Sequence, residues 1–152
     1  MTEVVWAAEG LEPFVEEADV ARAAAAALAF GGRAGVEVGV IFVREPELTA
    51  LHADHLDDPT ATDVITFDLG SEGDGPVGEL YISVDRALEV ARARGGRAAD
   101  ELLLYVVHGC LHLAGHDDHE ADARAAMRAA EREVLAQLGV RLVDGPHEFG
   151  DA

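Results

Sequence analysis

The chain has 152 residues, of which 49% are hydrophobic and 27% are charged, a composition typical of one ordinary globular domain. Thirty acidic residues against 11 basic ones give a net charge of −19, and a chain this acidic repels nucleic acid unless local positive charge or a metal offsets its field. No apolar run approaches the roughly 18 residues of a membrane span, and the single cysteine, Cys110, excludes an internal disulfide.

The first half of the chain alternates between strand and helix signals. Segments rich in β-branched and aromatic residues predict strands at 2–7, 36–43 and 62–69. Proline and glutamate at their starts predict helices at about 13–30 and 47–56. The acidic residues near the start of the chain stand where a secretory signal peptide would carry basic ones, which predicts a cytoplasmic protein.

The second half predicts one more strand and three helices. The strand is expected at 79–84, followed by a helix from Asp85, as its cap, to residue 94. A segment apolar nearly all round, 98–114, predicts a buried central helix, and an amphipathic helix is expected at 120–138. The elements mix without strict alternation, so we expect an α+β fold with a small mixed β-sheet covered by helices. Residues 1–152 are expected to form a single domain whose tail, 144–152, is frayed.

A run of histidines at 108–119 carries the strongest chemical signal. His108 and His112 are four residues apart, so on a helix they lie on the same face and reach one point about 2 Å from each ring, as zinc requires. Gly115 favours a left-handed end to this helix. The chain then turns back, and either Asp118 or His119 supplies a third ligand. Three protein ligands with one open position are typical of a catalytic zinc rather than a structural one.

Two readings without a metal compete with this prediction. A histidine on an apolar helix face is often only a core residue, and Asp117 with Glu120 resembles a capping box for the next helix. Four histidines and two aspartates around one helix end favour the metal. Cys110, inside the same apolar helix, is expected to be a small buried hydrophobic residue rather than a nucleophile.

The histidine motif, His108-Gly-x-Leu-His112-Leu-x-Gly115-x-Asp117, closely resembles the signature of the YbeY family of bacterial endoribonucleases. Three further segments are similar to that family in the same order along the chain. They are Thr62-Asp63-Val64-Ile65-Thr66-Phe67, Gly78-Glu79-Leu80-Tyr81-Ile82-Ser83, and the acidic helix with Met127-Arg128 and Glu131.

The resemblance implies a metal-dependent enzyme that cleaves single-stranded RNA. It further implies one zinc ion per chain, a role in 16S rRNA 3′-end maturation and late ribosome quality control, and the small ribosomal subunit as a partner. Neither a membrane nor DNA is expected as a partner. His108, His112 and His116 are then the expected catalytic residues, with His108, His112 and either Asp118 or His119 binding the metal.

The chain departs from the family pattern at two places. The usual third histidine falls at Asp118, and a gap-free alignment favours Asp118 as the ligand, whereas a one-residue bulge would bring His119 there instead. Leu56 stands where many relatives carry an arginine near the metal. The one dense basic stretch could bind the phosphate in place of that arginine, or it could be only a solvated helix face. It consists of Arg86, Arg92, Arg94 and Arg97. His52 and His55 flank Leu56.

Two other functions remain open at this point. A small zinc metallopeptidase shares two histidines at this spacing, but its motif places a glutamate directly after the first histidine, where this chain has Gly109. The other is a non-catalytic ribosome assembly factor with a structural metal. Chelation of the metal would unfold such a protein, but it would have no RNA cleavage to lose. His116, or whichever of Asp118 and His119 does not bind the metal, is a candidate for proton transfer.

Overall fold

A computed structural model describes residues 2–6, 15–44, 46–50, 64–69, 77–116 and 120–140 of the chain. Residues 46–50 form a helical turn between the second and third strands. The helices and strands alternate irregularly, which confirms the predicted α+β class. They are β1 (Thr2–Trp6), α1 (Glu17–Phe30), β2 (Val38–Val43), β3 (Val64–Asp68), β4 (Gly78–Ser83), α3 (Val84–Arg94), α4 (Ala98–Leu113) and α5 (Ala121–Gln137).

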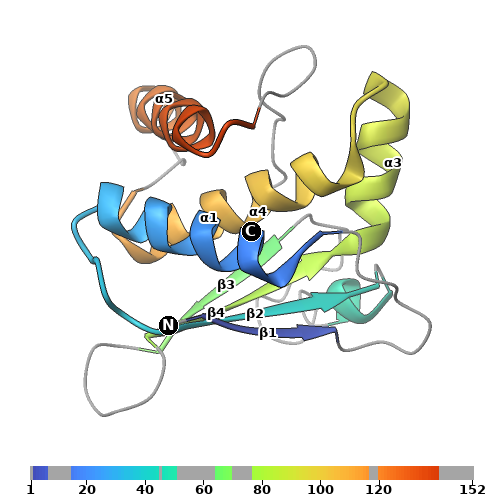
Figure 1. Ribbon diagram of the computed structural model, residues 1–152, viewed down its shortest axis with the longest axis horizontal. Helices are drawn as coiled ribbons and strands as arrows, with labels where there is room; N and C mark the ends of the chain where they lie inside the picture. The colour runs from blue at the N-terminus through green and yellow to red at the C-terminus, as the bar shows by residue number, and fades with distance from the viewer. Residues whose placement is uncertain are drawn as a thin grey trace.

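The four strands form one mixed sheet in the order β1-β2-β4-β3. β2 pairs in parallel with both β1 and β4, whereas β3 runs antiparallel to β4. Parallel pairing requires crossover connections, and α1 provides one of them between β1 and β2. α1 and α4 lie over one face of the sheet, and α5 lies on the far side of α4 from the strands (Figure 1).

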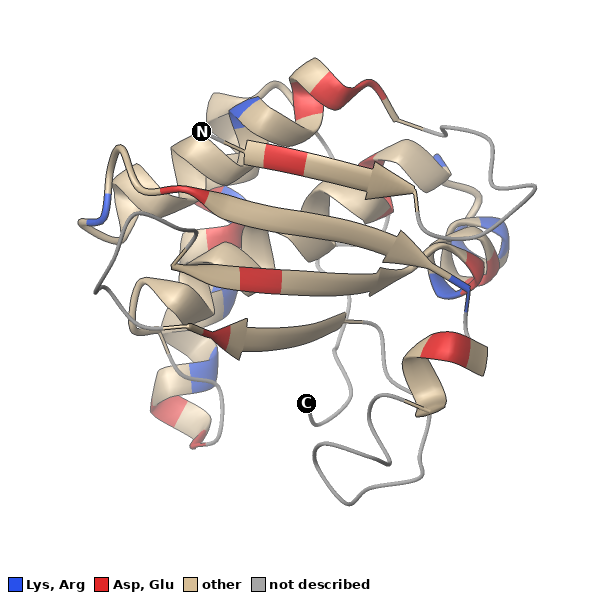
Figure 2. Ribbon diagram, turned by 90° about the horizontal axis from the view of Figure 1, so that it is seen from below, with Lys and Arg blue, Asp and Glu red and all other residues tan. Residues whose placement is uncertain are grey.

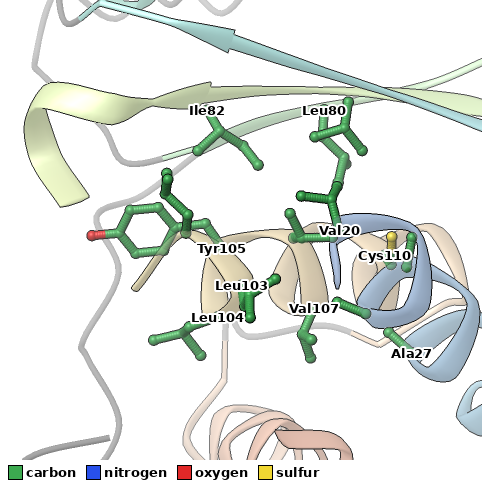
Figure 3. Packing of buried hydrophobic residues seen from close by; sticks show 14 of the residues in the cluster. Val20, Ala27, Leu80, Ile82, Leu103, Leu104, Tyr105, Val107 and Cys110 are labelled. Carbon is green, nitrogen blue, oxygen red and sulfur yellow. The ribbon is translucent and has the colours of Figure 1, made fainter. Parts of the chain in front are cut away.

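α4 is the central helix of the core, as its apolar sequence predicted. Every residue from Glu101 to Leu111 is buried, because the sheet, α1, α3 and α5 all pack against this helix. Figure 3 shows buried side chains on both sides of α4: Leu80 and Ile82 of β4 lie on the sheet side, and Leu104 and Val107 point away from the strands. A helix buried on all sides holds its polar residues in fixed surroundings, so the histidines on α4 are well placed for chemistry that needs a rigid site.

The start of α3 differs from the prediction, which placed the cap at Asp85. The N-cap is Ser83, whose hydroxyl oxygen accepts a hydrogen bond from the backbone N–H of Arg86 at 3.0 Å. Strand β4 therefore continues directly into the helix without a loop. Asp85 lies in the first helical turn and pairs with Arg44 at 3.2 Å, a contact across 41 residues that the local sequence does not reveal.

The end of α4 agrees with the prediction for Gly115. This glycine has a φ of 103°, and the N–H of His116 donates to the carbonyl of Leu111 at 2.9 Å. These features form the left-handed helix end that glycine permits. The predicted tail, 144–152, lies outside the described residues, as do Asp118, His119 and Leu56. Of the helices that are described, none has both the length and the apolar character needed to cross a membrane.

Candidate metal centre

His108 and His112 lie one turn apart near the C-terminal end of α4, as their spacing predicted. Their Nε2 atoms are 3.1 Å apart, and the ring centroids are 4.6 Å apart with the rings nearly perpendicular. His108 is buried, with a relative exposure of 3%, whereas His112 is only partly buried. The pair therefore brings two ring nitrogens close to a common point near the end of α4.

This geometry fits two ligands of one zinc ion. Two nitrogens bound to a tetrahedral zinc at 2.0–2.1 Å lie about 3.3 Å from each other, close to the observed separation. Within the described residues, no group of three His, Cys, Asp or Glu side chains is placed to hold a metal. The predicted third ligands, Asp118 and His119, lie outside those residues, so the choice between them stays a prediction.

A buried carboxylate on α5 supports His108 from behind. Oε2 of Glu131 lies 2.6 Å from Nδ1 of His108, and the Glu131 side chain has no exposed surface. Nη1 of Arg128 donates to both Glu131 oxygens, at 2.6 and 2.8 Å. Because burying a lone carboxylate is strongly unfavourable, the positive charge of Arg128 and the contact with His108 explain how Glu131 is accommodated.

The contact between His108 and Glu131 is the feature of this site that sequence reasoning missed. One signal for it was present: Glu131 falls on the apolar stripe of α5 between Met127 and Val134, all of which are buried. A charged residue on the buried face of a helix normally has a partner or a function. Spacing along the chain did not identify that partner, because His108 is 23 residues away.

His116 lies just beyond the end of α4, after Gly115. Its ring packs against Phe30 at the end of α1, with the ring centroids 6.2 Å apart. The backbone of His116 is fixed by its bond to Leu111, so the ring stays near the C-terminal end of α4. Its predicted role in catalysis remains a prediction.

Gly109 occupies the position at which a zinc peptidase motif has a glutamate. A Cβ built at Gly109 would lie 2.6 and 2.9 Å from the methyl carbons of Leu80 on β4. The position therefore faces the sheet rather than the point at which His108 and His112 converge. A glutamate at this position would enter the apolar core instead of reaching a water molecule near the histidines, which argues against a peptidase.

Cys110 does not contribute a reactive thiol. Its side chain is fully buried in the core, and burial raises the pKa of the thiol to about 12. A thiol with this pKa is protonated at neutral pH and is a poor nucleophile. The prediction that Cys110 is a small buried hydrophobic residue is confirmed.

The basic stretch considered as a substitute for the family arginine lies on α3 and at the start of α4. Figure 2 shows basic and acidic positions interleaved on α3. Arg86 pairs with Glu89 at 3.4 Å, and Arg92 and Arg94 lie in the last turn of α3. Arg97 is the N-cap of α4, at the opposite end of that helix from the histidines, where it lines a pocket of about 210 Å³. Two other arginines contact groups next to the histidine pair: Arg128 donates to Glu131, which contacts His108, and Arg33 donates to the backbone carbonyl of Leu113.

Comparisons with known proteins place the chain in one family. The family model described as "Endoribonuclease YbeY" matches residues 12–139. A protein of that name from Rhodopirellula baltica is 38% identical over 126 residues, which cover 82% of this chain. Similar proteins of the same name come from Carboxydothermus hydrogenoformans, with 36% identity over 72% of this chain, and Porphyromonas gingivalis, with 39% over 70%.

The matched region covers different shares of these relatives. It spans 65% of the Rhodopirellula baltica protein, just under two thirds of its length, and 76% and 70% of the other two. Among solved structures, the solution structure of TM1509 from Thermotoga maritima superimposes with a TM-score of 0.58 and 23% identity. That match covers 90% of this chain and 91% of the other. This structural likeness concerns the fold.

Proposed function

Because the chain belongs to the YbeY family of endoribonucleases, we propose that it is a zinc-dependent endoribonuclease that cleaves single-stranded RNA. Its substrate is the 16S rRNA precursor on the small ribosomal subunit, and its roles are 3′-end maturation and late ribosome quality control in the cytoplasm. The observation that carries the metal-dependent part is the 3.1 Å separation of the His108 and His112 Nε2 atoms on one rigid helix.

His108 and His112 hold one Zn²⁺ in this proposal, and Asp118 or His119 completes the ligand set. A bound Zn²⁺ supplies a Lewis acid for the phosphodiester and lowers the pKa of a coordinated water towards about 7. Every residue of α4 around the two histidines is buried, so the helix presents both rings in a fixed orientation. His116, just beyond the end of α4, is the candidate for moving a proton.

Electrostatics favour a cation at this end of α4. His112 lies in the last turn of the helix, where the aligned peptide dipoles of the helix place a partial negative charge. RNA approaching a chain of net charge −19 meets repulsion over most of the surface. A divalent cation between the two histidines would concentrate positive charge where the phosphate must bind.

The first test is the zinc content of the purified protein, measured by elemental analysis. We expect one zinc per chain in the wild type and none in His108→Ala, with Glu133→Gln on the exposed side of α5 as a matched control that keeps its metal. Asp118→Ala and His119→Ala identify the third ligand, since only one of them should lower zinc affinity by orders of magnitude. A folded wild type that binds no zinc would refute the metal centre.

The second test is RNA cleavage by the same proteins. The zinc-loaded wild type should cut a single-stranded RNA and leave a duplex of the same sequence intact, and His108→Ala should cut neither. If zinc removal lowers the melting temperature while no RNA is ever cut, the protein is an assembly factor with a structural metal rather than a nuclease.

A further inference from the structure

We propose that Glu131 is a positioning residue that fixes the tautomer of His108. In this arrangement the proton of His108 resides on Nδ1, bound by Glu131, and the lone pair of Nε2 points towards Nε2 of His112. The value of this arrangement for metal binding rests on the proposed function, whereas the tautomer is a property of the metal-free chain.

The tautomer follows from the chemistry of the contact. An ionised carboxylate accepts hydrogen bonds and donates none, so the 2.6 Å contact requires a proton on Nδ1 of His108. In neutral imidazole only one nitrogen carries a proton, which leaves Nε2 of His108 as a lone-pair donor. A metal ligand must be such a nitrogen. The buried carboxylate thereby prepares His108 for binding before any metal arrives.

Arg128 holds Glu131 in the position that this contact needs. It lies one turn before Glu131 on α5 and donates to both carboxylate oxygens, while its side chain is only 14% exposed. The positive charge of Arg128 also cancels the negative charge of Glu131. The pair therefore orients His108 without adding net negative charge to a centre that has to accept an RNA phosphate.

The same contact joins two helices. Glu131 and Arg128 lie on α5, whereas His108 lies on α4, and both side chains of the His108–Glu131 pair are almost completely buried. Side chains held in this way lose little further freedom when a ligand binds, which favours tight binding. Removing a residue that hydrogen-bonds to a metal-binding histidine typically weakens metal binding by about 10- to 100-fold.

The experiment begins with the metal-free protein. Long-range ¹H–¹⁵N spectra of histidine-labelled protein distinguish the two tautomers, and the His108 signals are those absent from His108→Ala. We expect His108 of the wild type as the Nδ1–H form and a loss of that form in Glu131→Ala. Glu133→Ala, at an exposed position of the same helix, should leave the spectrum unchanged.

Zinc affinity, measured by competition with a chelator, is the second readout. We expect Glu131→Ala to bind zinc about 10- to 100-fold more weakly than the wild type, and Glu133→Ala to bind it as tightly as the wild type. Glu131→Asp keeps the charge but withdraws the carboxylate from Nδ1, so it should also weaken binding; it replaces the alanine variant if that variant does not fold.

Two results would overturn the inference. One is a wild-type His108 with its proton on Nε2, which needs no variant to be measured. The other is a folded Glu131 variant with zinc affinity within twofold of the wild type. A wild type in the Nδ1–H form that binds no zinc would support the tautomer and refute the proposed metal centre instead, so the two failures are distinguishable.

Discussion

The contact between Gly31 and Ala114 leads to a sharp prediction about how the metal-bearing helix is held. Gly31 ends α1, and a Cβ built on it would lie closer than 3.0 Å to the Cβ of Ala114, the C-cap of α4. Neither Cβ moves by side-chain rotation, because each is attached directly to the backbone. Gly31→Ala must therefore push the ends of α1 and α4 apart.

The magnitude follows from ordinary carbon contact distances. Carbon atoms pack at about 3.5–4.0 Å, so the two helix ends must separate by more than about 0.5 Å. Strain of this kind in a packed region costs about 1–3 kcal/mol. For a chain of this length, about 2 kcal/mol lowers the melting temperature by roughly 4–8 °C. The backbone of Gly31 has a φ of −83°, so alanine meets no backbone strain there and would otherwise stabilise the protein.

A double-mutant cycle measures this effect. Urea unfolding of metal-free protein, followed by circular dichroism, is compared for the wild type, Gly31→Ala, Ala114→Gly and the double variant. Removing the Cβ of Ala114 leaves the new Cβ with only ordinary contacts of 3.6 Å, so we expect a coupling free energy of about 2 kcal/mol.

The control is Gly39→Ala in β2, where the added Cβ would be 3.6 Å or more from its neighbours. That change should be neutral or stabilising by up to about 1 kcal/mol. Additive effects in the cycle, or a Gly31→Ala variant as stable as the wild type, would refute the steric reasoning.

Three further predictions concern α4 and its ends. Gly109→Glu drives a carboxylate against Leu80, so we expect it to lower the free energy of unfolding by about 3 kcal/mol or more without creating peptidase activity, as urea unfolding and a casein assay would show. Burial raises the pKa of the Cys110 thiol, so the stability that depends on this protonated thiol is complete below the ordinary thiol pKa of 9.0. The free energy of unfolding should then fall by up to about 1.4 kcal/mol per pH unit as pH rises from 9.0 towards about 12. Melting curves of Cys110→Ala recorded over this range should lack the pH dependence. Arg33→Met removes the donor that reaches the carbonyl of Leu113 at 2.6 Å and should cost about 1–2 kcal/mol in thermal melts, whereas an unchanged stability would contradict a role for this bond.

Local sequence patterns were sufficient to predict the features that depend only on residues close together along the chain. The four-residue spacing of His108 and His112 placed both rings on one helix face, because helix periodicity is a local property. Gly115 was expected to end that helix in a left-handed conformation, and its φ of 103° agrees. The α+β class and the mixed sheet also followed from strand and helix signals, each of which spans only a few residues.

Contacts between distant segments were decided by tertiary packing. The partner of His108 is Glu131, 23 residues away on α5, and their meeting depends on how α5 crosses α4. Asp85, expected to cap α3, instead pairs with Arg44 across 41 residues, whereas Ser83 caps the helix.

The chain by itself therefore determined which histidines face one point, because that depends on the pitch of a single helix. Only the tertiary structure decided which charges stand behind them, because burial and pairing of a carboxylate depend on the packing of separate helices around a common core.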